Sequence, residues 1–533
     1  MEVADRKQTG VEARRSWPET SSFLTRNAFW LLPALFSVCY FGRTMLRASG
    51  KPFWYDEICT LYIVRLPTFA DSWAAVMHGA DYNPPLFYII HRAFRALFGE
   101  SQLALRLPEI FSFWIFCLCL FRFVSKRAGL AAGWIAMALP MLTGAYYYAT
   151  EARPHGLVLG FLGLALICWQ ELQERPERWS WRLGFAAALG AAYFTHCYAV
   201  LLAIPFGLTE LWHTVREKKI RWREWITLFI PPIAAVISFI PLIRSFRTTL
   251  QDSGFQQQFA GKLSDIPDYY LFILAPCWLL VAAVIFLYVR GLREPQNQPP
   301  LGKRPSRQEL TLILSLCSLP VFGIVAAIVT RGPMFARYVL GVTAGCVLLL
   351  AFGCISRTFR HADSMLAILV ALVAFGLFAQ TVRLRHKGVE EYFVEPSTKT
   401  GFSRHPADPM ELYSKVLADS PPDKPLAIRS ILEFLYIYHY APEARARLYP
   451  ISVDRREPAY RLNKAVREWC RVDFNPEKQL DDFISEHRDF YFYGTVPDFL
   501  LLNNLFKRPG VTITSFKREE NSHFLLHVKV ATP

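Results

Sequence analysis

Long apolar runs recur along the first 381 residues, and short polar segments separate most of them. A helix needs about 20 apolar residues to cross the ~30 Å hydrocarbon layer of a membrane. The pattern predicts a polytopic all-α membrane protein with about eleven transmembrane helices, at 27–47, 107–123, 128–148, 155–171, 183–195, 198–214, 225–245, 268–290, 310–330, 335–355 and 364–381. The short runs 183–195 and 198–214 fit either two spans or one re-entrant hairpin. The first run is long for a signal peptide and lacks a small-residue cleavage site, so we expect an uncleaved helix.

Two long segments interrupt this pattern. Residues 48–106 contain apolar stretches that are too short and too broken to span, and we expect them to lie at the membrane interface as amphipathic helices. One additional short span is the alternative. It would place the basic segment 125–127 on the less basic face, so the interfacial arrangement is preferred.

Residues 382–533 have the composition of a soluble domain, with 23 Lys/Arg and 21 Asp/Glu residues. Their hydrophobic pattern alternates between the periods of strands and helices. It predicts strands at 426–429, 448–453 and 490–493, helices at 431–440, 458–472 and 496–505, and a final hairpin that pairs 511–516 with 524–530. We therefore expect a C-terminal α/β domain.

The charge distribution gives an orientation. The chain carries a formal net charge of +15, and nearly all of this excess lies before residue 382. If the N-terminus is cytoplasmic, the segments on the cytoplasmic side contain most of the basic residues, so the positive-inside rule favours this orientation. The basic excess is thus typical of a cytoplasmic membrane face and does not indicate nucleic-acid binding. The expected organisation is a cytoplasmic N-terminus (1–26), a transmembrane domain (27–381) and an extracytoplasmic α/β domain (382–533). We expect a bacterial inner (plasma) membrane location.

Cysteines and phosphate-binding motifs give no sign of a cofactor. Nine of the eleven cysteines lie in apolar runs, and only Cys59 and Cys470 do not. The spacing fits neither a disulfide framework nor a zinc site, and neither a Walker loop nor a dinucleotide-binding loop is present. Asp56 and Glu57 could approach a divalent cation, but two carboxylates alone are a poor cage. We expect no resident metal and no cofactor.

Candidate chemistry is concentrated in the predicted outer segments. Asp56 and Glu57 follow Tyr55 about ten residues beyond the first span, where partial burial would raise the pKa of a carboxylate and a nearby cation would lower it. Tyr82 and Asn83 precede a double proline that restricts the backbone on either side. The other candidates lie at the outer ends of later spans, and they are Arg153, His196, Arg337 and Tyr338.

Each of these residues also has an ordinary explanation, such as a solvated turn, a helix start, a cation that reaches lipid headgroups or a packed histidine. However, the loop charges place all of them on one face. A carboxylate base beside cations suits a reaction that deprotonates an acceptor hydroxyl while a phosphate leaves. A lipid-borne phosphate fits this depth in the membrane.

These residues resemble a known family. The motifs Trp-Tyr-Asp56-Glu57, Asn83-Pro-Pro-Leu-Phe-Tyr, Arg106-Leu-Pro, Glu-Ala-Arg153-Pro and Phe-Ala-Arg337-Tyr occur in that order. They look like the polyprenyl-phosphate-sugar-dependent glycosyltransferases of the GT-C superfamily. The similar groups are the bacterial dolichyl-phosphate-mannose-protein mannosyltransferase-like and aminoarabinose-transferase-like proteins.

The resemblance implies a GT-C-like fold with an extracytoplasmic active site, and a transfer that inverts the anomeric carbon. Asp56 would act as general base with Glu57 as a catalytic neighbour. The residues implied in binding the donor phosphate and sugar are Arg153, Arg337, Tyr338, Asn83, Tyr82, His196 and Tyr55. Two positions depart from the family, because related chains often carry lysine in place of Asn83 and of His196.

The implied partners are a polyprenyl-phosphate sugar donor, an envelope lipid, glycan or protein acceptor, and membrane lipids, with no nucleic acid. A secondary transporter or lipid flippase is an alternative from another class, although it would place ionisable residues deep in the spans. A membrane-anchored binding protein is a further alternative. Within the enzymes, a lipid-diphosphate-dependent glycan polymerase or ligase is the nearest alternative.

Overall fold

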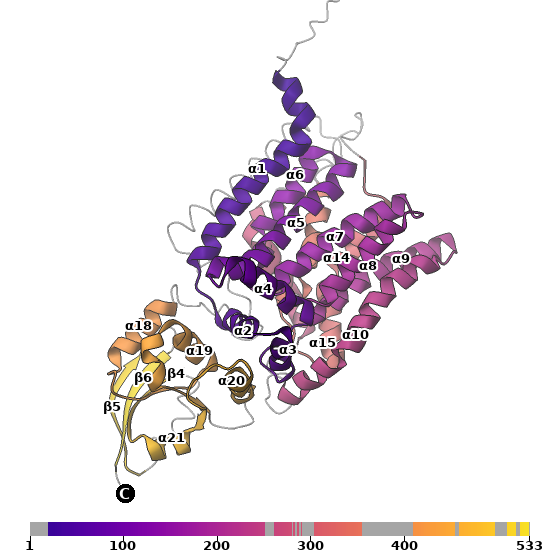
Figure 1. Ribbon diagram of the computed structural model, residues 1–533. Coiled ribbons are helices and arrows are strands. Elements are labelled where there is room, and N and C mark those ends of the chain that lie inside the picture. The colour runs from indigo at the N-terminus through magenta and orange to yellow at the C-terminus, as the bar shows by residue number, and fades with distance from the viewer. Residues whose placement is uncertain are drawn as a thin grey trace, which may run out of the picture.

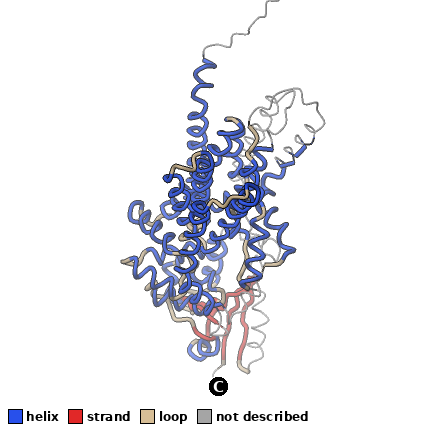
Figure 2. Tube along the Cα trace, turned by 90° about the vertical axis from the view of Figure 1, so that its right-hand side faces the viewer, coloured by secondary structure: helices blue, strands red, loops and turns tan. Residues whose placement is uncertain are grey.

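The computed structural model describes residues 20–250, 261–279, 303–353, 409–452, 458–495, 509–518 and 523–531, with a few positions between 281 and 289. Apolar helices form the larger part, and a mixed sheet with its own helices lies at one end (Figures 1 and 2). The helices of the larger part are α1 (Thr20–Gly50), α5 (Gln102–Ala128), α6 (Leu130–Ala138), α7 (His155–Glu174), α8 (Trp179–Tyr193), α9 (Ala203–Glu217), α10 (Trp222–Leu250), α12 (Ile266–Leu274), α14 (Arg307–Cys317), α15 (Leu319–Thr330) and α16 (Val342–Gly353).

The described residues contain five helices that are long and apolar enough to cross a membrane, or up to seven if each bent pair counts as one span. One bent pair combines α6 and its 3-10 extension with the 3-10 helix η2 (Gly144–Thr150), at an angle of 72°. The other joins α14 to α15 at 49°. The prediction of a polytopic helical protein is confirmed. The number eleven is not, because α8 and α16 have only 15 and 12 residues and the predicted span 364–381 lies outside the described residues.

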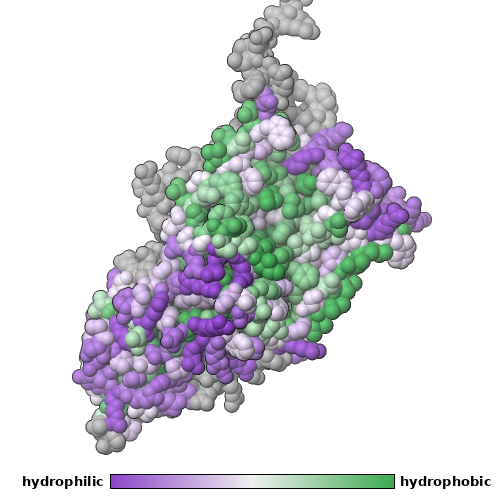
Figure 3. Space-filling model, in the orientation of Figure 1, coloured by the Kyte–Doolittle hydropathy of each residue, from purple (hydrophilic) through white to green (hydrophobic). Residues whose placement is uncertain are grey.

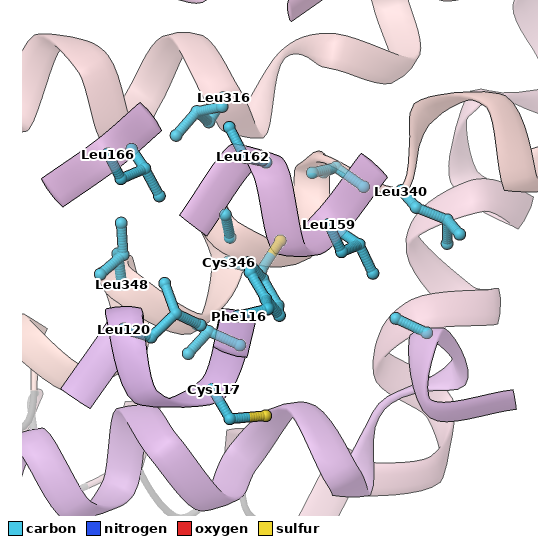
Figure 4. Close-up of a cluster of buried hydrophobic side chains, with 14 of the residues drawn as sticks. Phe116, Cys117, Leu120, Leu159, Leu162, Leu166, Leu316, Leu340, Cys346 and Leu348 are labelled. Atoms are coloured by element: carbon cyan, nitrogen blue, oxygen red, sulfur yellow. The ribbon is translucent and has the colours of Figure 1, made fainter. Parts of the chain in front are cut away.

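The core of the bundle forms where α5 and α7 approach closely. Figure 4 shows side chains of α5, α7, α14 and α16 turned towards a common centre, among them Phe116, Leu162 and Cys346. Gly160 permits this approach, since a Cβ atom at that position would lie 2.7 Å from the backbone oxygen of Ser112. Small residues allow helix backbones to come together in this way in a membrane.

The long segment between α1 and α5 folds into three short helices, namely α2 (Tyr55–Val64), α3 (Phe69–Met77) and α4 (Pro85–Phe98). They contain 10, 9 and 14 residues, so none has the ~20 residues of a membrane span. Pro85 occupies the first turn of α4, where its missing N–H is not needed. The amide of Leu86 donates to the carbonyl of Phe194 (3.0 Å) and so ties α4 to the end of α8.

The C-terminal part is a six-stranded mixed sheet with the strand order β3-β2-β1-β4-β6-β5. Strands β1 to β4 are parallel, and β6 is antiparallel to both β4 and β5. Its elements are α18 (Pro409–Asp419), β1 (Leu426–Ile428), α19 (Ile431–Tyr440), β2 (Leu448–Ser452), α20 (Pro458–Trp469), β3 (Lys478–Gln479), α21 (Leu480–Glu486), β4 (Asp489–Thr495), β5 (Val511–Arg518) and β6 (His523–Val530).

The predicted α/β class of this part is confirmed. All three predicted strands, the final hairpin, and the helices at 431–440 and 458–472 are present, the latter ending at Trp469. The sequence pattern did not predict α18, α21 or the two-residue β3. The predicted helix 496–505 and the boundary at residue 382 lie outside the described residues.

The α/β part contacts the short helices between α1 and α5. The amide of Phe53 donates to the hydroxyl of Tyr440 (2.5 Å), and the hydroxyl of Tyr62 lies 3.1 Å from Nδ1 of His439. Trp469, at the end of α20, stacks on His78 with a ring separation of 3.5 Å. Helix α19 therefore packs on α2, the helix that carries Asp56 and Glu57.

Candidate active site

The segments that carry the candidate residues meet at one end of the helix bundle. These segments are the start of α2, the turn before α4, the turn between η2 and α7, the 3-10 helix η3 (Cys197–Leu202) and the 3-10 helix η6 (Ala336–Val339). Helix α7 starts at this end, and its 20 residues extend about 30 Å away from it. The candidate residues therefore lie near one face of the membrane and not at its midplane.

Asp56 lies in the first turn of α2 and retains 26% of its side-chain exposure. The Nε atom of Arg153 lies 3.7 Å from its carboxylate. The same guanidinium donates to both carboxylate oxygens of Asp81, at 2.8 and 3.3 Å, and to the backbone oxygen of Asp56 at 3.3 Å. Arg153 thus holds two acids together but binds Asp81 more closely.

The two acids differ in pKa because their surroundings differ. Burial raises the pKa of Asp56, and the positive charges of Arg153 and Arg337 offset only part of that rise. Burial also acts to raise the pKa of Asp81, but the charge and hydrogen bonds of Arg153 outweigh it, so the pKa of Asp81 is lowered. Asp56 is consequently the stronger base of the pair and is also the more exposed one.

Glu57 is fully buried and has a different environment from its neighbour Asp56. Arg106, also fully buried, donates to both of its carboxylate oxygens at 2.7 and 2.6 Å. The amides of Ala152 and Trp54 donate to the same carboxylate at 2.7 and 3.2 Å. Burial tends to raise the pKa of Glu57, but Arg106 outweighs it and the pKa is lowered. With four donors around it, this carboxylate fixes the start of α2 against α5 and the turn before α7.

A second buried ion pair adjoins the first. The Nζ atom of Lys51 lies 2.9 Å from Oε1 of Glu151 and 4.1 Å from the ring centre of Tyr147. Arg106 also donates to the backbone oxygen of Lys51 at 2.6 Å. The two pairs join the end of α1, the start of α2, α5 and the turn that holds Arg153. We call these four residues the buried network: Lys51, Glu57, Arg106 and Glu151. In the sequence, Lys51 and Glu57 lie five residues and one residue from Asp56, and Glu151 lies two residues from Arg153. Arg106 pairs with Glu57.

A pocket lies near Asp56, since the positive charge of Arg337, which is part of the pocket lining, acts on the carboxylate of Asp56. It has an empty volume of about 340 Å³, partly open to solvent, and η3, η6 and the start of α7 line it. Arg337, His155, His196, Tyr198 and Tyr338 form its polar and aromatic side. The opposite lining is apolar and consists of Val158, Ala199, Leu201, Leu202, Leu319, Val339, Leu340 and Gly341. The pocket lining thus combines one permanent cation, Arg337, with an apolar wall.

Aromatic rings fix the polar side of the pocket. Tyr198 stacks on Tyr338 with ring centres 4.2 Å apart, and its hydroxyl donates to the backbone oxygen of Pro333 at 2.6 Å. The guanidinium of Arg337 lies over the ring of Phe335 at 4.3 Å. Burial and the nearby arginines lower the pKa of His196 to about 3. His196 is therefore a neutral imidazole at physiological pH.

The remaining candidates, Asn83, Tyr82 and Tyr55, lie outside the pocket. The side-chain amide of Asn83 donates to Asp81 at 2.9 Å, and the backbone amide of Tyr82 donates to it at 2.8 Å, so this turn orients Asp81. The side chain of Tyr55, the first residue of α2, is buried. None of the three is part of the pocket lining.

Sequence reasoning did not assign roles to several residues that complete the site. Asp81 is not among the candidates from the sequence, and Arg106 enters there only as part of the Arg-Leu-Pro motif. His155 and Tyr198 line the pocket without having been candidates. For Arg106 a signal existed, because a lone cation between Leu105 and Leu107 on an apolar helix requires a buried partner. Among the described residues, no group of three or more His, Cys, Asp and Glu side chains could hold a metal ion.

Comparisons with known proteins agree with this architecture. The family model described as dolichyl-phosphate-mannose-protein mannosyltransferase matches residues 82–243, less than half of the chain. A search of curated proteins gave no match. The solved structures that are similar include ArnT from Cupriavidus metallidurans, in the apo state (TM-score 0.56) and bound to undecaprenyl phosphate (TM-score 0.54).

Both ArnT matches have 14% sequence identity, and they cover 95% and 94% of this chain and 98% of ArnT. The oligosaccharyltransferase of Archaeoglobus fulgidus also matches, with 9% identity, a TM-score of 0.44, and coverage of 90% of this chain and 70% of that protein. At such identities the ArnT matches establish the fold. The chain is a multi-pass membrane protein with a GT-C fold, similar to ArnT over almost its whole length.

Proposed function

We propose that the chain is a membrane glycosyltransferase that moves a sugar from a polyprenyl-phosphate-linked donor to an acceptor hydroxyl, with inversion. One observation carries this proposal. A partly exposed carboxylate with a raised pKa, Asp56, lies beside a pocket that offers a guanidinium on one side and an apolar wall on the other. A prenyl chain suits the wall, and its phosphate suits Arg337.

In this mechanism the carboxylate of Asp56 accepts the proton of the acceptor hydroxyl as its oxygen attacks the anomeric carbon. The bond between that carbon and the phosphate oxygen breaks, and the polyprenyl phosphate leaves with the electron pair. Arg337 neutralises the charge that develops on the leaving group. Attack opposite the leaving group inverts the anomeric configuration.

Arg153 and Glu57 act on the position of the base in this proposal. Arg153 was expected to bind the donor phosphate, but its guanidinium is directed at Asp81 and at Asp56. We assign it to holding the two acids. Glu57 has no exposed oxygen and four hydrogen-bond donors, so it is a positioning residue and not a second base.

The charge of the pocket favours a monophosphate donor over a diphosphate. Arg337 is the permanent cation of its lining, and His196 stays neutral because of its low pKa. A neutral imidazole can hydrogen-bond one phosphate oxygen but does not balance a further negative charge. By the family resemblance, His196 of the lining stands where related chains often carry lysine, which lowers the positive charge of the pocket further.

The acceptor is expected to approach past the α/β part. Helix α19 packs on α2, and α20 contacts α3 through Trp469 and His78. The α/β part thus borders the helix that carries Asp56, and we assign it to acceptor selection. We place this face on the extracytoplasmic side, because the basic segments lie at the opposite end of the bundle. A bacterial inner membrane stays our expectation for the location.

The test is transfer of radiolabelled sugar by the purified full-length protein, with membrane extract as the acceptor pool. The donor panel contains polyprenyl-phosphate sugars and polyprenyl-diphosphate sugars. We expect label to move from a monophosphate donor with the wild-type protein and not with Asp56→Asn. Analysis of the labelled product then identifies the acceptor and its anomeric configuration.

Three outcomes of this test contradict the proposal in different ways. Transfer by Asp56→Asn at the wild-type rate removes Asp56 as the base. Transfer from a diphosphate donor alone identifies the lipid-diphosphate-dependent reaction. A folded protein that transfers from neither donor class favours transport of the lipid over chemistry.

A further inference from the structure

The end of the bundle opposite Asp56 carries a basic surface. Helix α7 ends there, α8 begins there, α9 ends there and α10 begins there. The connections are joined, since Arg182 of α8 pairs with Glu224 of α10 at 2.9 Å and Arg221 donates to Gln173 of α7 at 3.0 Å. In Figure 3, hydrophilic residues gather at this end of the helices, next to a hydrophobic band along α10.

Four exposed cations on these connections, Arg178, Lys218, Lys219 and Arg223, form what we call the basic rim. None of them forms an ion pair with another described residue. Most of the nearby acids are bound to other cations: Glu171 and Glu174 to Lys126, Glu210 to Arg221, and Glu224 to Arg182. The charge of the rim is therefore opposed mainly by two exposed acids, Glu177 and Glu217, of which Glu217 also lies 3.7 Å from Arg216.

The backbone presents one of these cations at a local cost. Lys218 ends α9 with a left-handed conformation, at φ 52° and ψ 29°. Glycine is the usual residue at such a helix end, because a Cβ atom makes the conformation unfavourable. The chain thus has a lysine where glycine would fit the turn better.

Two exposed tryptophans flank the rim. Trp179 and Trp222 follow and precede its cations in sequence, and 70% and 67% of their surfaces are exposed. The apolar side chains of Val215 and Ile220, between them, are exposed as well. Tryptophans mark the depth at which a membrane protein meets the headgroups, so the rim lies at headgroup level.

We propose that the basic rim is a binding surface for the headgroups of anionic phospholipids in the leaflet opposite the active site. The rim supplies the charge for a phosphate, and the tryptophans and exposed apolar residues contact the acyl chains beneath it. The positive charge of the rim favours anionic lipids over zwitterionic ones. Each such cation contributes a factor of about five in affinity near an anionic surface, so zwitterionic lipids bind more weakly.

The test is native mass spectrometry of the purified full-length protein in detergent. The protein is titrated separately with phosphatidylglycerol, phosphatidylcholine and inorganic phosphate. The test variant combines Arg178→Gln, Lys219→Gln and Arg223→Gln. We expect the wild-type protein to retain phosphatidylglycerol over phosphatidylcholine, and the variant to lose that preference by up to ~100-fold, about a factor of five for each cation.

A matched triple variant controls for net charge. Lys464→Gln, Arg488→Gln and Lys529→Gln neutralise three exposed cations of the α/β part. An equal loss of phosphatidylglycerol in this control would overturn the proposal, as would full retention in the rim variant. Binding of inorganic phosphate that competes with the lipid at similar concentration would overturn it as well, since the site would then recognise phosphate without a lipid.

Lys218→Gly separates binding from folding. Glycine relieves the left-handed backbone, so this variant should be at least as stable as the wild type while it loses about fivefold in phosphatidylglycerol affinity. Unchanged affinity in a folded Lys218→Gly protein would overturn the proposal in its present form, because each cation of the rim is expected to contribute to binding. Because the readout is lipid binding and not sugar transfer, the result is independent of the proposed enzyme function.

Discussion

Asp56 and Glu57 are adjacent carboxylates whose substitution should have opposite consequences. Asp56→Asn should remove sugar transfer and leave the fold almost unchanged. Glu57→Gln should destabilise the protein first, and reduce transfer only through that loss. The contrast follows from exposure, since Asp56 retains 26% of its side-chain surface and Glu57 retains none.

The magnitudes can be worked out from the contacts. Glu57→Gln leaves the buried guanidinium of Arg106 without a counter-charge, and removing one partner of a buried ion pair costs ~3–5 kcal/mol. Glutamine keeps one acceptor oxygen, so we expect the lower end of this range, ~3 kcal/mol. For a chain of 533 residues this lowers the melting temperature by ~2–3 °C. Asp56→Asn loses a partly exposed contact of 3.7 Å to Arg153, worth at most ~1 kcal/mol, but loses ~10²-fold or more in rate.

The assay measures thermal unfolding and sugar transfer on the same preparations in one detergent. Glu100→Gln is the matched control, because its carboxylate also receives two arginines, Arg65 and Arg95, but is one-third exposed. We expect its melting temperature to stay within ~1 °C of the wild type. The difference between Glu57→Gln and Glu100→Gln then isolates the effect of burial.

Two results would refute this reasoning. A Glu57→Gln protein that melts at the wild-type temperature would show that the buried network does not stabilise the start of α2. A Glu57→Gln protein that is stable but inactive would show that Glu57 takes part in the chemistry, against the geometry of its four donors.

Three further outcomes follow from the site. Arg337→Ala should raise the donor KM by ~10- to 10²-fold through the loss of a charged hydrogen bond. Arg331→Gly, which removes an exposed cation of the same loop, should not raise it, and equal effects would reject a specific phosphate contact. Transfer should fall as the pH drops through the raised pKa of Asp56, and Asp81→Asn should move that acid limb to lower pH because the negative charge of Asp81 raises the pKa of Asp56; a pH–rate profile that does not move would contradict this. Burial lowers the pKa of His439 to about 4, so the neutral ring contributes to stability above pH ~6.5, and this contribution is lost as the pH falls towards 4. His439→Gln should remove this part of the pH dependence of the melting temperature.

The sequence predicted much of the fold because the bilayer and the sheet impose simple periods. Long apolar runs indicated membrane helices, and alternating patterns located the strands of the α/β part to within a few residues. The ends of the helices and the bends within them were harder to predict from the sequence. The 72° bend between α6 and η2 lies inside the predicted span 128–148, where the apolar composition is continuous and no period marks the break.

For the site, the sequence identified which residue types could support the chemistry and that they share one face. Only the family resemblance distinguished Asp56 from Glu57. The residue pattern could not show that Glu57 is buried, because its burial depends on Arg106 and Ala152, which lie 49 and 95 positions away in the sequence. Nor could it show that Arg153 is engaged by Asp81. Such pairings are made by chain segments that meet only when the helices pack.

What the sequence determined by itself was therefore the membrane-spanning character, the α/β part and the set of chemically capable residues, since these depend on local composition and period. Tertiary structure alone decided which carboxylate is partly exposed and which is a buried counter-ion. The reason is physical: the pKa and the availability of a charged group are set by desolvation and by partners distant in sequence, and both arise from packing.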